Sequence, residues 1–262
     1  MKVASTEFNG YRSDSKTWTD KLLRHNISHM EIAVANLPEN EDDQHKIISY
    51  ALAQGIALNL HAPYGINNIS STDKELRAFS IANVKRSIDL AAKYNLGVVT
   101  FHPGRLSDEK DDPKKIWSDM LETVADLAQY AKEKQVYIGL ENMELRPYEL
   151  VFTIEDLNRF AHIGENNPYF GVTIDFAHYT TLNIGLPDLR ALKLPVHDVH
   201  LSQVVDGKPH ISLARANGAP DVDAVCRLLM EYGYDGFIVL EHGTPLWESL
   251  EILDAAIKAL QE

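Results

Sequence analysis

Short runs of apolar, often β-branched residues alternate along the chain with longer segments whose apolar positions recur at helical spacing. Runs such as Val98-Val99-Thr100-Phe101 are apolar at consecutive positions, which is typical of parallel strands that helices cover on the outside. The pattern predicts eight strands, over residues 3–8, 29–34, 57–61, 98–102, 136–141, 171–175, 196–201 and 237–241.

Helical periodicity is clearest in five of the intervening segments, residues 73–94, 113–133, 154–163, 221–232 and 247–260. The first of these has capping candidates at Ser71-Thr72-Asp73, and Asn95-Leu96-Gly97 supplies a stop signal. Eight strand–helix units in 262 residues match the usual size of a (β/α)₈ TIM barrel.

A doubly wound open sheet would show the same alternation. It usually carries a glycine-rich phosphate loop after an early strand, and the sequence contains neither GxGxxG nor GxxxxGK[ST]. The chain also lacks any tract that reads as a linker. We therefore expect one domain over residues 1–262, a closed TIM barrel with its active site at the C-terminal ends of the strands.

Six of the predicted strands end in a side chain that can bind a metal ion. These residues are His61, His102, Glu141, Asp175, His200 and Glu241, and His178 follows Asp175 by three positions. The C-terminal strand ends of a barrel converge on one mouth, so these groups should point into a single cavity. Buried carboxylates repel one another and are costly without a counter-charge, which a divalent cation would supply. Histidine with carboxylates suits Zn, Mn, Fe or Co, and a carboxylate-rich subset also suits Mg.

The remaining histidines have simpler explanations. Solvation accounts for four in helices, helix ends or strand starts, namely His25, His29, His45 and His162. Strand alternation directs His197 and His242 away from the cavity. His210 is expected in a loop, where its position decides nothing.

The charge balance disfavours some partners. Lys and Arg number 25 against 38 Asp and Glu, so the formal net charge is −13 and nucleic acid is a disfavoured partner. The only cysteine is Cys226, the N-terminal segment lacks the pattern of a signal peptide, and no apolar run is long enough to span a bilayer. We expect a cytoplasmic protein without membrane contact. Whether it forms a homo-oligomer is left open by the sequence.

Taken in order, the strand-end motifs resemble those of the xylose isomerase-like TIM barrel superfamily. They are Leu60-His61-Ala62-Pro63-Tyr64, Phe101-His102-Pro103-Gly104, Leu140-Glu141-Asn142-Met143, Ile174-Asp175-Phe176-Ala177-His178, Val199-His200-Leu201-Ser202 and Val239-Leu240-Glu241. This superfamily contains sugar isomerases and epimerases, inosose dehydratases and endonuclease IV. The motifs run from the third strand to the eighth, so the resemblance covers most of the chain.

Resemblance to the epimerase branch implies one Zn, Mn, Co or Mg ion held by Glu141, Asp175, His200 and Glu241. It also implies that the two glutamates move a proton to and from the carbon beside a carbonyl. His178 would then touch substrate oxygens, and Arg215 could reach a hydroxyl or phosphate. Arg105 is another residue that could serve a phosphate.

Endonuclease IV shares more of the ring, with counterparts of His61, His102, His178 and His210. Three departures separate this chain from it: Lys208 stands at an aspartate position, Gln203 at another, and residues 214–218 replace a Gly-x-Gly stretch. The leading hypothesis is therefore a metal-dependent isomerase or epimerase acting on a small sugar, sugar acid or polyol. An inosose- or shikimate-type dehydratase and a zinc-dependent phosphoesterase of the endonuclease IV kind are the alternatives.

Overall fold

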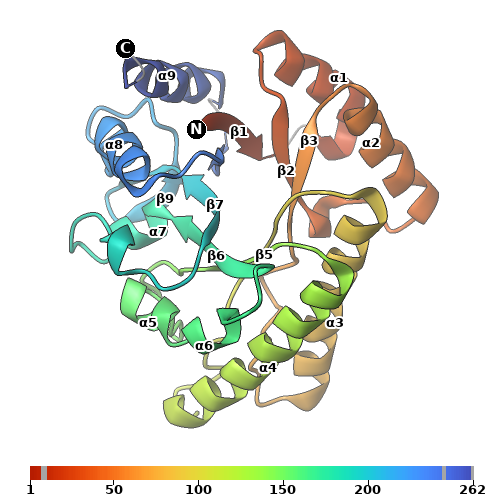
Figure 1. Ribbon diagram of the computed structural model, residues 1–262, viewed down its shortest axis with the longest axis vertical. Coiled ribbons are helices and arrows are strands. Elements are labelled where there is room, and N and C mark those ends of the chain that lie inside the picture. Colours follow the sequence, from red (N-terminus) through yellow and green to blue (C-terminus); the bar gives the residue numbers. More distant parts are fainter. Residues whose placement is uncertain (7–10, 244–245, 261–262) are drawn as a thin grey trace.

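The computed structural model describes residues 1–6, 11–243 and 246–260, and within them eight parallel strands close into a barrel (Figure 1). Around the barrel the order is β1-β10-β7-β6-β5-β4-β3-β2, which confirms the predicted TIM barrel and excludes the open sheet. The strands are β1 (Lys2–Thr6), β2 (His29–Ala33), β3 (Ala57–His61), β4 (Val99–Phe101), β5 (Ile138–Glu141), β6 (Phe170–Asp175), β7 (Val196–Leu201) and β10 (Phe237–Leu240).

Helices follow the strands and cover the barrel from outside, with α3 and α4 side by side (Figure 1). They are α1 (Tyr11–Arg24), α2 (Glu41–Ala53), α3 (Lys74–Tyr94), α4 (Pro113–Lys134), α5 (Ile154–Asn158), α6 (Ala161–Gly164), α7 (Phe176–Thr180), α8 (Val222–Tyr232) and α9 (Leu246–Ala259), with single 3₁₀ turns at Val34–Asn36 and Leu189–Ala191. The expected caps of α3 are present, because the Asp73 side chain accepts from two backbone N–H groups and Asn95 is left-handed. None of the helices in the described ranges has the length and apolar character that crossing a bilayer requires.

The main hydrophobic core lies between the strands and the helices, where Leu60, Val99 and Leu140 are fully buried. The barrel interior is polar by contrast. Asn59 donates to Asp198 across it at 2.5 Å, and the hydroxyls of Thr100 and Thr173 are 2.9 Å apart. Gly139 lies beside these threonines, and a Cβ there would collide with Thr173 Oγ1. This polar interior forms the floor beneath the strand ends.

Two predictions of secondary structure were wrong. The segment expected as one helix over 154–163 is divided into α5 and α6, because the N–H groups of Arg159 and Phe160 bond three residues back and turn the fully buried Phe160 into the core. His210 was expected in a loop, but it lies in β9 (Lys208–Ile211), which pairs with β8 (Gln203–Val205) as a hairpin. Asp206 and Gly207 both have positive φ at its turn, a preference of Asp-Gly that the sequence already contained.

Strand boundaries differ slightly from those expected. β4 and β10 end one residue before His102 and Glu241, so these two side chains follow their strands directly. The predicted first strand ran to residue 8, and residues 7 and 8 lie outside the described part of the chain.

His29 is not solvated as expected, since only 4% of its surface is exposed. It begins β2, and its ring stacks on Phe237 of β10 with 3.6 Å between ring centroids. Burial lowers the pKa of His29 to about 4. This is below the ordinary value for histidine, so the unfolded chain binds the proton more tightly than the folded one.

Replacing His29 with Phe should therefore reduce the loss of stability in acid. The stabilising contribution of neutral His29 is complete above pH 6.5 and falls as the pH drops toward 4. The wild type should lose about 2 kcal/mol through this group between pH 7.5 and pH 5, and His29→Phe should not. Denaturant unfolding at both pH values measures the difference, with the exposed His162→Phe as control. Equal acid losses in wild type and His29→Phe would refute the assignment.

Candidate metal and active site

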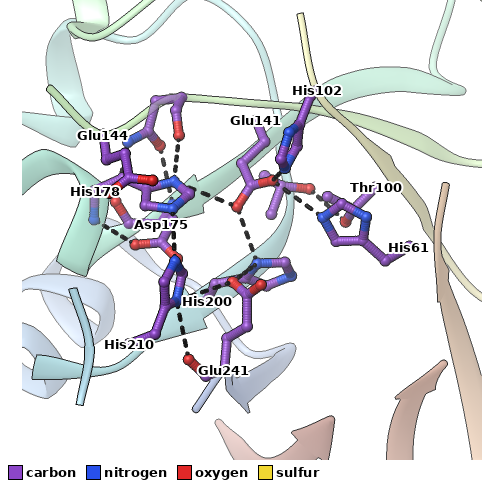
Figure 2. Close-up of polar contacts among 12 residues, drawn as sticks. His61, Thr100, His102, Glu141, Glu144, Asp175, His178, His200, His210 and Glu241 are labelled. Carbon is purple, nitrogen blue, oxygen red and sulfur yellow. Dashed lines mark hydrogen bonds and ion pairs between the residues drawn. The ribbon is translucent and has the colours of Figure 1, made fainter. Parts of the chain in front are cut away.

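The strand-end side chains gather at one mouth of the barrel (Figure 2). Parallel register places Asp175 of β6 directly beside His200 of β7. Eight of the ten residues singled out from the sequence belong to this cluster: His61, His102, Glu141, Asp175, His178, His200, His210 and Glu241. The other two are arginines outside these ligand groups, the exposed Arg215 and the partly buried Arg105.

Four of these residues form what we call the inner group: Glu141, Asp175, His200 and Glu241. Each offers a ligand atom, and the four atoms lie within 4.8 Å of one another. His200 Nδ1 is 3.1 Å from Glu141 Oε1 and 3.0 Å from Glu241 Oε2, so one nitrogen faces two carboxylates. Asp175 Oδ2 is buried and has no hydrogen-bond partner among the described residues.

The inner group fits a divalent cation. Three carboxylates and one imidazole are almost completely buried, and burial of unpaired negative charge is costly. A cation among these atoms would give Asp175 Oδ2 a partner and would separate the charges of Glu141 and Glu241. The donor set of one nitrogen and several oxygens suits Zn, Mn, Co or Fe, and its carboxylates also suit Mg.

A second set of ligand atoms surrounds the other oxygen of Glu141. His102 Nε2 is 3.0 Å and His61 Nε2 is 3.3 Å from Glu141 Oε2. His61 Nδ1 donates to the backbone oxygen of Ala62 at 2.8 Å, because a carbonyl can only accept. In neutral His61 the Nε2 atom therefore carries a lone pair and faces another acceptor, an arrangement that a proton or a metal ion would stabilise.

A third set joins His178 to His210 in the same way. His178 Nδ1 donates to the Asn142 backbone oxygen at 2.9 Å, and His210 Nδ1 donates to that of Glu241 at 3.1 Å. The two Nε2 atoms face each other at 3.2 Å (Figure 2). Glu144 completes this set with a carboxylate oxygen, although Lys208 occupies the position where endonuclease IV was expected to have an aspartate.

A family model described as xylose isomerase-like TIM barrel matches residues 20–262. The chain belongs to this family. Two relatives from Methanocaldococcus jannaschii, the uncharacterized proteins MJ1188 and MJ1311, are each 26% identical to it, over 182 and 194 residues. These matches cover 70% and 71% of this chain and 65% and 64% of the relatives, so the chain spans less than two thirds of either protein.

Solved structures share the whole fold of this family member. A D-tagatose 3-epimerase-like protein has a TM-score of 0.83 and 21% identity, over 100% of this chain and 98% of that one. D-psicose 3-epimerase with D-tagatose, from Clostridium cellulolyticum H10, has a TM-score of 0.77 and 18% identity, over 100% and 97%. The IolI protein with a zinc atom has a TM-score of 0.76 and 18% identity, over 99% and 98%. At these identities the likeness shows the fold alone.

Proton affinities in this xylose isomerase-like barrel reflect the concentration of charge. Burial favours the neutral form of Asp175 and raises its pKa to about 6. Burial also opposes a charged His200, but the carboxylates of Glu31, Glu241 and Glu141 outweigh it and raise the pKa of His200 well above its ordinary value. The same imidazolium keeps the pKa of Glu141 low against the effect of burial. Protons and a metal ion therefore compete for the same buried atoms.

Sequence reasoning missed two buried carboxylates below the inner group. Glu31 of β2 is 1% exposed and its Oε2 lies 3.2 Å from His200 Nε2, on the side of the ring away from Glu141 and Glu241. Asp198 of β7 is close to both, and burial raises its pKa to about 7. An acidic residue in the interior of a predicted buried strand is the signal that could have revealed each of them.

Proposed function

We propose that this chain is a metal-dependent isomerase or epimerase that acts on a small sugar, sugar acid or polyol by proton transfer beside a carbonyl. The observation that carries the proposal is the placement of two glutamates, Glu141 and Glu241, on either side of the same imidazole nitrogen in a buried group of metal ligands. The names of the solved structures with this fold, which include a D-tagatose 3-epimerase-like protein, D-psicose 3-epimerase and L-ribulose 3-epimerase, support ketoses as the substrate class.

Glu141, Asp175, His200 and Glu241 would hold the cation, which when bound would polarise a carbonyl and stabilise negative charge on neighbouring oxygens. One of the two glutamates takes the proton from the carbon beside the carbonyl, and the other returns a proton to the neighbouring position or the opposite face. His178 is held by the bond from its Nδ1 to Asn142, and its Nε2, which lies beside His210 Nε2, would contact the substrate oxygens. Tyr64 and His61 line a small hollow together with Glu241, and a substrate that enters this hollow would contact them.

Proton exchange with solvent tests this proposal. The metal-loaded protein should introduce deuterium from D₂O at the carbon beside the carbonyl of at least one ketose in a broad panel. The NMR signal of that proton should disappear with time, and EDTA should stop its loss. Release of water with a new double bond would identify the dehydratase alternative instead. A panel without any exchange in the presence of Zn, Mn, Co or Mg would contradict the isomerase class.

A zinc-dependent phosphoesterase is the second candidate, favoured by the two outer sets of ligand atoms around Glu141 Oε2 and the His178–His210 pair. Two or three ions would be needed there, so metal analysis separates the candidates: about one ion per chain supports the isomerase and about three the phosphoesterase. Cleavage of an oligonucleotide with an abasic site, weakening with added salt, would support the second candidate. The net charge of −13 and the residues Lys208 and Gln203 disfavour it.

A further inference from the structure

A hollow of about 410 Å³ lies beside the metal ligands, between the loops that follow β3, β4 and β5. Arg105, Arg146 and Glu149 line it, together with Tyr64 and His102. His102 connects the hollow to the ligand cluster, because its Nε2 atom is 3.0 Å from Glu141 Oε2. Tyr64 stacks on His102 and also lines the small hollow with Glu241, so this one side chain borders both spaces.

The two arginines of this hollow differ in their partners. Arg146 is compensated, because its Nε lies 3.0 Å from Glu144 and its Nη2 lies 3.3 Å from Glu149. Arg105 donates from Nη2 to the backbone oxygen of Gly65 at 2.6 Å. In the described ranges no carboxylate lies within ion-pair distance of it, although its charge, with that of Arg146, counteracts the burial that raises the pKa of Glu149. A guanidinium has five N–H donors in a planar fork, so most of those of Arg105 face the hollow without a protein acceptor.

The backbone of Arg105 is fixed by two hydrogen bonds with the side chain of Asn68. Its N–H donates to Asn68 Oδ1 at 3.1 Å, and its carbonyl accepts from Asn68 Nδ2 at 2.9 Å. The side chain is partly buried, and its bond to Gly65 ties it to the neighbouring loop. An arginine held in this way loses little freedom when it binds, unlike the exposed Arg215.

We propose that Arg105 binds an oxyanion, phosphate or carboxylate, at the end of the substrate away from the reacting carbon. The proposal deepens the proposed function and rests on it for the reaction. The reacting end would lie near Glu241, the middle over Tyr64 and His102, and the anionic end against Arg105. A fixed cation that forms no ion pair with any carboxylate in the described ranges, in a chain of net charge −13, attracts such a group selectively. The substrate class is thus a ketose phosphate or a keto sugar acid.

Direct binding tests the subsite without turnover. Isothermal titration of the metal-loaded protein should detect glycerol 3-phosphate or D-glucuronate and give no signal with glycerol or D-glucose at the same concentrations. The phosphate and carboxylate arms identify which oxyanion is preferred. Arg105→Gln should weaken binding of the preferred probe roughly tenfold or more, and Arg105→Lys, which keeps the charge, should weaken it less. Arg86→Gln, an exposed position on α3, is the matched control and should bind as the wild type does.

Two results would overturn the subsite: no binding of either anionic probe to the wild type, or equal binding by wild type and Arg105→Gln. The second result would place the anion on the metal ion instead. With an active substrate, Arg105→Gln should raise KM for the anionic ketose roughly tenfold and leave kcat within about threefold. If the wild type exchanges no proton with any ketose but binds the anionic probe through Arg105, the proposed function is refuted and the subsite is supported. The two failures are therefore distinguishable.

Discussion

Glu141→Gln and Glu241→Gln should each lower turnover and proton exchange beside the carbonyl by roughly 10³-fold. General acid–base catalysis by a positioned side chain contributes about 10²- to 10⁴-fold, and an amide cannot take up the proton. Both glutamates lie beside His200 Nδ1, so the two variants should fail alike although the residues come from β5 and from the end of β10. Deuterium uptake and turnover of the same ketose measure the loss.

Metal binding must be followed in the same variants, because both residues are also proposed ligands. Glutamine keeps one oxygen for coordination, so metal content measured at saturating metal shows whether the loss arises from the missing base or from a missing ion. Glu122→Gln, exposed on α4, is the matched control and should retain full activity. Activity that survives in both Glu141→Gln and Glu241→Gln would show that other groups transfer the proton.

Glu31→Gln should weaken binding of Zn²⁺ or Mn²⁺ roughly 10- to 100-fold. His200 presents Nδ1 to the inner group and Nε2 to Glu31, so a carboxylate behind the ring sets the tautomer and strengthens the ligand nitrogen. Glutamine can still accept the hydrogen bond but lacks the charge, and Glu31→Ala, which loses both, should weaken binding further. Isothermal titration of the metal-free proteins measures the affinities.

The control for this second experiment is Glu75→Gln, an exposed carboxylate of α3. Titrations should be made well below the unfolding temperature of each variant, so that reduced stability alone does not lower the apparent affinity. Unchanged affinity in both Glu31→Gln and Glu31→Ala would show that Glu31 does not position His200 as a ligand.

Prediction from the sequence succeeded where the signal was local. Apolar strand runs and helical periods depend on nearby residues, so the order of strands and helices and the caps of α3 could be predicted. Prediction from the sequence failed where tertiary packing determines the local structure. Phe160 breaks the helix expected over 154–163 by turning into the core, and His29 is buried against Phe237 from the far end of the chain.

The residue pattern alone was enough to predict a (β/α)₈ barrel with side chains able to bind metal at the ends of six strands. It could not determine their partners. Glu31 contacts His200 across 169 residues, and the Nδ1 atoms of His178 and His210 donate to backbone carbonyls that lie 36 and 31 residues away along the chain. The three-dimensional arrangement was needed to see which nitrogens face the site and that Arg105 lines the hollow beside it while Arg215 is exposed, because those distances depend on how separate strands and loops pack together.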